Sequence, residues 1–194
     1  MSRKIEFDLN EATEAAMRLF WQQGFENTSM DQLLKEMQIG QGSFYNKFKS
    51  KRCLYQSCLK YYSEKVTAKR VEVLFKNPDI PQAINDFFRI MIKSVGSKNV
   101  PQGCLLTNSL CSEVLAEGEL ESYILGELEK LERVFRDKLL EARQKGQVAQ
   151  SLNPATVAAL LITFIQGINK VSKTHKSTNQ LLKQAKCLLD SLGI

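Results

Sequence analysis

Acidic residues are missing from one long stretch of this 194-residue sequence, between Gln38 and Ser63. The same stretch contains five basic residues, Lys47, Lys49, Lys51, Arg52 and Lys60, in a chain whose net charge is +6. A local excess of positive charge is compatible with a nucleic-acid partner. A solvated helix face produces the same pattern, so charge alone leaves both interpretations open.

Proline and long apolar runs are also scarce. With only 4 prolines and 10 glycines, long helices can run without interruption. The longest apolar stretch, near Val157–Ile165, is too short to span a membrane and is followed by Gln166. Residues 1–10 lack the apolar segment of a signal peptide. We therefore expect a cytoplasmic protein with no membrane partner.

Residues for catalysis are equally hard to find. The single histidine, His175, lies in a polar stretch, and no nucleophile elbow, phosphate loop or metal-ligand cluster appears. The Gly40-Gln41-Gly42 run lacks the third glycine and the preceding strand of a dinucleotide site. The five cysteines are interpreted as thiols rather than as a disulfide framework. An enzyme is not expected, and neither is a cofactor or a metal.

Helical spacing of apolar residues recurs along the chain, and no strand pattern is visible, so an all-α fold is predicted. The first helix has its apolar face at Ala12, Ala16 and Phe20 and ends at Gly24. Downstream, apolar periodicity and breaks at proline and glycine predict further helices at roughly 82–95, 104–115, 119–145, 154–171 and 179–192.

Three short helices are predicted between residues 29 and 63. Ser29 and Gln32 have the spacing of a capping box, which starts the second helix. Gly40 is the expected N-cap of a third helix, Gln41–Phe48, and Ser50 that of a fourth. Two short helices joined by a tight turn and packed on a first helix form a helix-turn-helix, whose second helix enters the DNA major groove.

The third helix has the composition of a DNA-reading helix. Phe44 and Phe48 are spaced to anchor one face in a core, which leaves the polar residues Gln41, Ser43, Asn46 and Lys47 on other faces. Glutamine and asparagine can read adenine, and lysine can neutralise phosphates. Gly42 has no side chain and allows a close approach to DNA.

The segment from Leu19 to Lys51 resembles the DNA-binding domain of the TetR family of repressors. Matching elements appear in order at Gly24-Phe25, Thr28-Ser29-Met30, Gly42-Ser43-Phe44-Tyr45, Phe48 and Lys49-Ser50-Lys51. The resemblance implies an N-terminal three-helix DNA-binding domain at residues 5–64, with the helix-turn-helix at about 29–48. It also implies a C-terminal helical-bundle domain, residues 65–194, for ligand binding and dimerisation.

Function and residue roles follow from that resemblance as expectations. A homodimer would bind palindromic double-stranded operator DNA as a repressor and be released by a small-molecule or electrophile effector. Base or groove contacts are implied for Gln41, Ser43 and Asn46, and phosphate contacts for Thr28, Ser29, Tyr45, Lys47 and Lys51. Gly40 stands where the family usually has a capping serine or threonine. Lys47 stands where the family has a histidine, just before Phe48. A non-specific DNA-binding protein and a helical adaptor are the alternatives outside this family.

The predicted helices at 119–145 and 154–171 suit the dimer interface. The second is apolar on most sides, so we expect Leu160, Leu161, Phe164 and Ile168 to form a continuous surface. A helix nearly apolar all round must be buried on most sides. A four-helix interface between two subunits would cover it.

Cys104, Asn108 and Cys111 share one face of a predicted helix that starts at Cys104. A thiol at a helix N-terminus has more thiolate character, and the Gly103-Cys104-Leu105 run is similar to that of family members that sense electrophiles or oxidants. A small apolar core residue is the other interpretation of Cys104. A Cys104–Cys111 disulfide is excluded, since seven helical residues rise about 10.5 Å, beyond the ~7 Å limit between Cα atoms.

Overall fold

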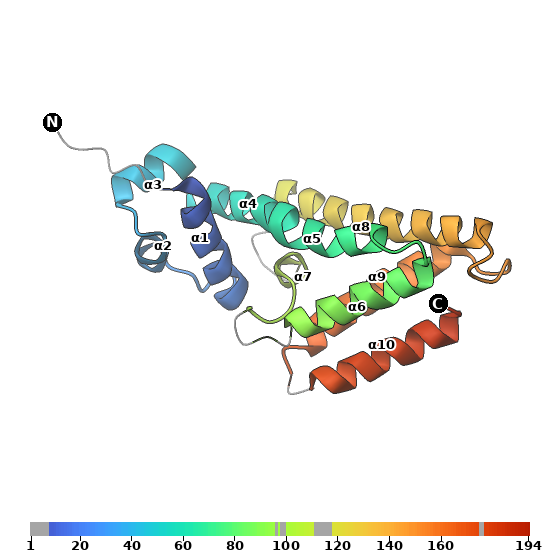
Figure 1. Cartoon of the computed structure of the whole chain (residues 1–194). Coiled ribbons are helices and arrows are strands. Elements are labelled where there is room, and N and C mark those ends of the chain that lie inside the picture. Colours follow the sequence, from blue (N-terminus) through green and yellow to red (C-terminus); the bar gives the residue numbers. More distant parts are fainter. Residues whose placement is uncertain (1–7, 96, 98–99, 111–117, 175–176) are drawn as a thin grey trace.

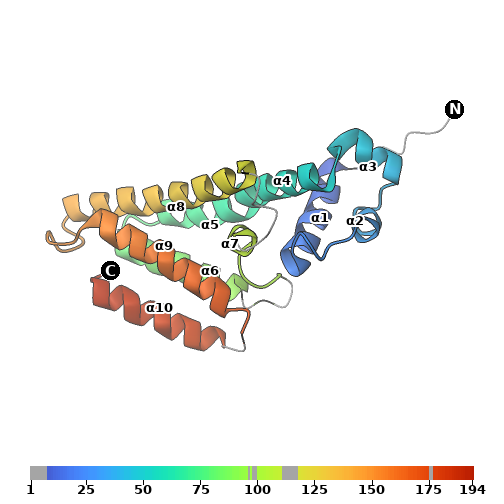
Figure 2. The same cartoon turned by 180° about the vertical axis from the view of Figure 1, so that it is seen from behind.

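The computed structural model describes residues 8–95, 97, 100–110, 118–174 and 177–194. Within these ranges every regular element is helical, which confirms the predicted all-α fold. A small N-terminal unit sits at one end of the molecule, and an elongated helical body extends away from it (Figures 1 and 2).

The N-terminal unit contains α1 (Leu9–Gln23), α2 (Met30–Met37), α3 (Gln41–Phe48) and the start of α4 (Lys51–Tyr62). Helices α1, α2 and α4 each begin where a side chain caps the first turn. Asp8 accepts hydrogen bonds from two N–H groups of α1, Ser29 forms a capping box with Gln32, and the Ser50 hydroxyl accepts from Cys53 N–H. Gly24 ends α1 with a φ of 84°, a backbone conformation that favours glycine.

One almost continuous helical path leads from this unit into the body. After α4 the chain passes through a π-helical turn, η1 (Ser63–Thr67), then α5 (Ala68–Val71) and a 3-10 turn, η2 (Glu72–Phe75). The expected division between residues 64 and 65 falls inside η1. The backbone therefore crosses this division without a loop, and helical rigidity connects the two parts of the chain.

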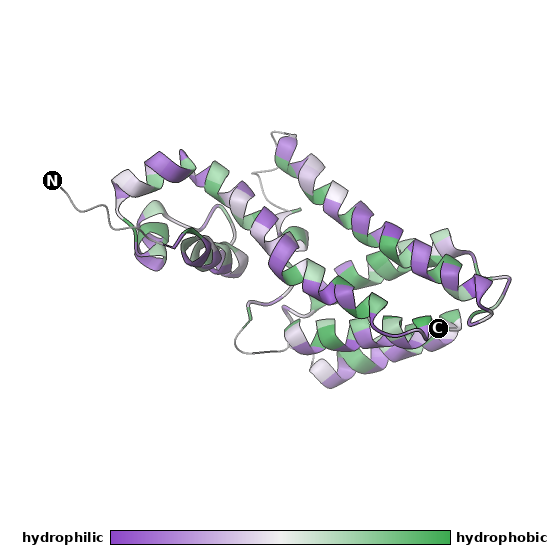
Figure 3. Ribbon diagram, turned by 45° about the horizontal axis from the view of Figure 1, so that its top comes forward, coloured by the Kyte–Doolittle hydropathy of each residue, from purple (hydrophilic) through white to green (hydrophobic). Residues whose placement is uncertain are grey.

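The body is built from α6 (Ile80–Val95), α7 (Leu105–Ser109), α8 (Glu119–Gln144), α9 (Pro154–Val171) and α10 (Thr178–Leu192). Its core includes the edge-to-face pair of Phe87 and Phe135, with ring centroids 5.1 Å apart. Hydrophobic segments gather where the body helices face one another, and hydrophilic residues dominate their outer faces (Figure 3). Burial of these apolar faces is the main force that assembles the bundle.

Predicted helix positions in the body are confirmed with small shifts. Helix α6 begins at Ile80, two residues before the predicted start, because Asp79 Oδ1 accepts the Gln82 N–H and Pro81 fits the first turn. Helix α7 covers only 105–109 of the predicted 104–115 helix, and residues 111–117 lie outside the described residues. Asn153 and Pro154 start α9 as predicted.

The surface predicted for α9 is wrong in detail. Leu161 and Ile168 are buried in the body's core and Phe164 is half-buried, whereas Leu160 is 46% exposed. Helix α9 packs along α8, so one apolar side faces inward. The helix is long and apolar enough to span a membrane by composition alone, but 44% of it is buried in the body, as in a core helix. The exposed side instead carries Thr156, Ala159, Leu160, Thr163 and Gly167.

The N-terminal unit shares its core with part of the body. Leu105 and Leu106 of α7 and Leu120 and Ile124 of α8 belong to the same buried cluster as Phe20 of α1. One buried polar contact crosses this junction, where the Tyr55 hydroxyl of α4 lies 2.5 Å from Ser109 Oγ of α7. Ser109 also donates to Leu105 O at 2.7 Å. A buried side-chain hydrogen bond therefore joins α7 to α4.

We expect Tyr55→Phe to lower the free energy of unfolding by about 1–2 kcal/mol, because the buried Ser109 hydroxyl loses a partner. Urea denaturation followed by circular dichroism measures this change. Tyr61→Phe is the matched control, since its hydroxyl bonds the exposed Glu14 at 3.0 Å, and a change below about 0.5 kcal/mol is expected there. Equal losses in both variants would contradict the junction's role.

Candidate nucleic-acid interface

The α2–α3 pair has the geometry of a helix-turn-helix. Gln38 closes α2 in the left-handed region, with φ 54° and ψ 39°, and its N–H points back at Leu34 O and Lys35 O. Ile39 follows and is buried, with its N–H bonded to Leu34 O at 3.2 Å. The turn is thus fixed by a buried side chain and by backbone bonds, which sets the direction in which α3 leaves.

The N-terminus of α3 is open. Gly40 occupies the N-cap position, and no side chain caps the helix. A serine or threonine there would use its oxygen to satisfy the first N–H groups. With glycine those groups stay available to an anion, and the helix dipole adds partial positive charge at the same point. A phosphate oxygen is the partner that such an end is suited to bind.

The side chains of α3 divide into an anchored face and a presented face. Phe44 and Phe48 are buried, 5.6 Å apart between ring centroids, and fix the helix to α1 and α4. Tyr45 is 47% exposed and packs edge-to-face on Phe44. The predicted contact residues Gln41, Gly42, Ser43, Asn46 and Lys47 are all exposed. A Cβ added at Gly42 would meet nothing within 4 Å, so internal packing does not require glycine here.

Thr28 and Ser29 precede α2 but are oriented differently. The Thr28 side chain is 1% exposed, and its hydroxyl donates to Gly24 O at 2.6 Å. It therefore fastens the α1–α2 turn, and its side chain does not face solvent as a phosphate contact would. Ser29 is exposed, and its oxygen accepts the Gln32 N–H at 3.2 Å. Its hydroxyl can still donate one hydrogen bond to a partner.

The basic residues around α3 differ in their surroundings. Lys47 and Lys49 are exposed, and within the described part of the chain neither forms an ion pair. Lys51 is half-buried, with Nζ 4.3 Å from the centroid of the Phe25 ring. Burial lowers the pKa of Lys51, and the nearby Glu26 carboxylate opposes that effect. Lys51 is thus held in place, whereas Lys47 is free to follow a phosphate.

Two of the three predicted sensor residues, Cys104 and Asn108, lie at the junction of the two parts. Cys104 is the N-cap residue of α7 and is 9% exposed. Its side chain lies beside Tyr62, a fully buried residue of α4 whose pKa burial raises well above the usual value. Asn108, half-buried, donates to Gln102 O at 3.4 Å, and its buried Oδ1 lacks a partner. Cys111 lies outside the described residues.

Sequence reasoning missed two open clefts beside the same junction. They lie between α1, the turn η1 and the residues Ser97 and 100–102, and Trp21 lines both of them. Their walls come from segments up to about 150 residues apart in sequence. A local sequence pattern does not indicate which distant segments will pack together. A tryptophan that lines a cleft therefore cannot be distinguished in the sequence from one that only packs in the core.

Family comparisons agree with this geometry. Residues 12–58 match the family described as bacterial regulatory proteins, tetR family. Residues 81–187 match the tetracyclin repressor-like C-terminal domain, so the second match alone covers more than half of the chain. The first match includes the whole helix-turn-helix, and the second includes all of α7, α8 and α9.

Two curated relatives are bacterial regulators. The HTH-type transcriptional repressor ComR of Escherichia coli K12 is 26% identical over 180 residues, covering 92% of this chain and 86% of that protein. The uncharacterized HTH-type transcriptional regulator YezE of Bacillus subtilis 168 is 29% identical over 148 residues and covers 76% of each chain.

Solved structures share the fold. A cysteine mutant of the TetR-family regulator CifR, solved with a 26-bp double-strand operator, has a TM-score of 0.89 at 24% identity, over 97% of this chain and 98% of that one. The reduced form of Escherichia coli NemR has a TM-score of 0.75 at 19% identity, over 91% and 94%. Taken with the two domain matches, these likenesses place the chain in the TetR family of transcriptional regulators.

Proposed function

We propose that this chain is a repressor that binds a near-palindromic operator as a homodimer and releases it when an effector acts on the helical body. One observation carries the proposal: α3 presents an uncapped N-terminus and an exposed polar face, anchored from behind by two buried phenylalanines. The relative ComR is named as a repressor, and the CifR structure contains operator DNA, which supports the same activity here.

The proposed contacts follow from exposure and chemistry. Gln41, Ser43 and Asn46 are assigned to base edges or the groove wall, because their amides and hydroxyl can accept and donate. Tyr45, Lys47 and Lys51 are assigned to phosphates, with Ser29 at the start of α2. Gly42 allows the backbone of α3 to approach the duplex closely. Thr28 contributes by holding the turn that positions Ser29.

The dimer is proposed to form through the exposed sides of α8 and α9. On α9 this side combines Leu160 with small residues at helical spacing, so another helix could approach closely. On α8 the exposed Leu140 lies beside the α9 N-terminus, where both helices border one shallow cleft. Two copies related by a two-fold axis would bury these faces against each other and place two α3 helices toward one DNA face.

A palindromic site with half-site centres about one to two helical turns apart, roughly 34–70 Å, is expected to bind one dimer. Selection from random duplexes followed by sedimentation of the complex measures both symmetry and stoichiometry. Leu160→Glu should weaken dimerisation and operator binding together, because it places a charge in the interface. Phe75→Glu is the control, since Phe75 is also an exposed apolar residue but belongs to η2 rather than to α8 or α9. A monomer on one asymmetric site would refute the proposal.

Base and phosphate contacts are expected to behave differently when removed. Lys47→Ala and Lys51→Ala should weaken binding to all sequences and reduce the salt slope by about one unit each. Gln41→Ala should instead relax preference at particular base pairs, at a cost of about 1–3 kcal/mol. Fluorescence anisotropy at several salt concentrations, with operator and scrambled duplexes, separates the two effects. Lys183→Ala, on the exposed side of α10, is the control.

A cysteine-based sensor is the second candidate for the effector step. Cys104 is buried at the start of α7 beside Tyr62 of α4, so an adduct on its sulfur could not fit without moving one of these helices. If the adduct stabilised a conformation with another spacing of the two α3 helices by a few kcal/mol, the dimer would dissociate from the operator. The other candidate for the effector step is a small molecule that binds the helical body reversibly.

Treatment of the wild-type protein with an electrophile or with peroxide is expected to lower operator affinity, while Cys104→Ser should keep its affinity. Anisotropy before and after treatment measures the loss, and mass spectrometry of peptides identifies the modified thiol. Cys187→Ser is the matched control, because Cys187 is exposed on α10. If the Cys104→Ser protein loses affinity as readily as wild type, Cys104 is structural. Reversible binding of a small ligand is then the remaining candidate for the effector step.

A further inference from the structure

We propose that the two clefts beside α1 form one binding site for a small amphipathic carboxylate, a carboxylate group with an apolar tail. The inference deepens the proposed function, on which its regulatory meaning rests, by naming the chemical class of an effector. It concerns the junction between the N-terminal unit and the body rather than the interior of the body.

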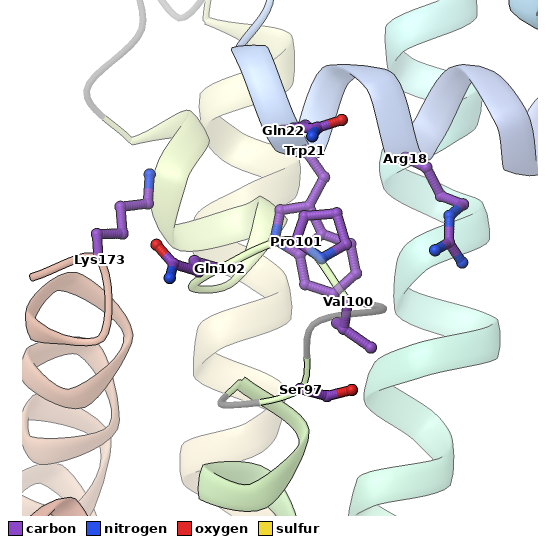
Figure 4. A pocket seen from close by; sticks show the side chains of 8 residues that line it. All are labelled: Arg18, Trp21, Gln22, Ser97, Val100, Pro101, Gln102 and Lys173. Carbon is purple, nitrogen blue, oxygen red and sulfur yellow. The ribbon is translucent and has the colours of Figure 1, made fainter. Parts of the chain in front are cut away.

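The two clefts adjoin. Their volumes are about 450 Å³ and 290 Å³, and Arg18, Trp21, Val100 and Pro101 line both. One wall is α1, with Arg18, Trp21 and Gln22, and the opposite side carries Ser97, Gln102 and, at the end of α9, Lys173 (Figure 4). A molecule bound here would touch the N-terminal unit and the body at once.

Charge in this region favours an anion. The smaller cleft is lined by Arg18, Lys65, Lys69 and Arg70, and Lys173 borders the larger one. Arg70 is held by two hydroxyls, Tyr62 Oη at 3.5 Å and Ser94 Oγ at 3.0 Å. Neither hydroxyl offsets its positive charge, as a carboxylate would. Among the described lining residues one acid is present, Glu14, which already accepts from Tyr61.

Trp21 supplies an independent sign of a missing acceptor. Its side chain is 5% exposed, and its indole Nε1 has no hydrogen-bond partner, although the ring packs edge-to-face on Tyr62 at 4.9 Å. Buried donors are nearly always paired, and an indole N–H can only donate. Because Trp21 extends from α1 toward Val100 and Pro101, which line both clefts, an oxygen of a bound anion is a suitable partner (Figure 4).

Apolar surface next to these cations points to an organic anion rather than an inorganic one. Val66, Val100 and Pro101 line the smaller cleft, together with Ile90, which is 42% exposed. A hydrated phosphate gains nothing from such walls, whereas an alkyl or aryl tail would remove them from water. The carboxylate would lie among the cations near Trp21, and the tail would lie along Ile90 and Val66.

Intrinsic fluorescence tests this site directly, because Trp21 is the protein's single tryptophan. Titration of the full chain with octanoate should change the Trp21 emission and reach saturation. Octanamide, its neutral counterpart, and inorganic phosphate should produce much weaker changes. Equal responses to octanoate and octanamide would refute a charge-recognising site, and an equal response to phosphate would refute the tail. No saturable change with octanoate up to millimolar concentration would refute the site itself.

The double variant Lys65→Glu/Lys69→Glu should bind octanoate about tenfold more weakly or worse, since two attractive charges become repulsive. Both lysines are exposed, so folding should be preserved. Lys183→Glu, an exposed lysine of α10 outside the clefts, should bind octanoate like wild type. An unchanged affinity in the double variant would overturn the assignment.

Operator binding is measured separately on the same proteins. Octanoate binding without operator binding would contradict the proposed function alone. Operator binding without octanoate binding would contradict this inference alone.

Discussion

The packing of α4 against α7 is the contact on which the arrangement of the two parts depends. Helix α4 ends the N-terminal unit and runs through η1 into the body, so its position is fixed from both sides. Tyr55 bonds Ser109, and Tyr62 is fully buried beside Cys104 and Trp21. Burial raises the pKa of Tyr55 to about 12, which keeps its hydroxyl neutral and able to hydrogen-bond throughout the physiological pH range.

Local chemistry explains why so much of the fold was predictable from sequence. Ser29 with Gln32, Ser50, and Asn153 with Pro154 each specify a helix start through hydrogen bonds that reach three residues at most. The start of α9 matches the prediction because Asn153 caps it, whereas α3 matches without a side-chain cap at Gly40. Helix α10 begins at Thr178, one residue before the predicted start, because the Ser177–Gln180 capping box lies there.

Features that depend on distant segments were beyond that reasoning. Periodicity identified α9 as apolar but could not say which side α8 covers, so Leu161 and Ile168 were expected on the surface and are buried. The resemblance assigned Thr28 to phosphate, although its hydroxyl reaches back to Gly24 O and its side chain is covered. Trp21 looked like any core aromatic, because its unpaired Nε1 and the surrounding cations appear only once the chain is folded.

The junction also explains why two different chemical signals could produce the same response. A thiol adduct at Cys104 and an anion beside Trp21 would both act next to Tyr62, which lies beside both residues. Either event would change what α4 packs against, and α4 itself packs on α1 and α3 and runs on into η1 and α5. Because two α3 helices must meet successive grooves together, a small rotation of each α4 would be enough to mismatch their spacing. Under the proposed function, the position of a site beside α4 would matter more than the chemistry of the signal.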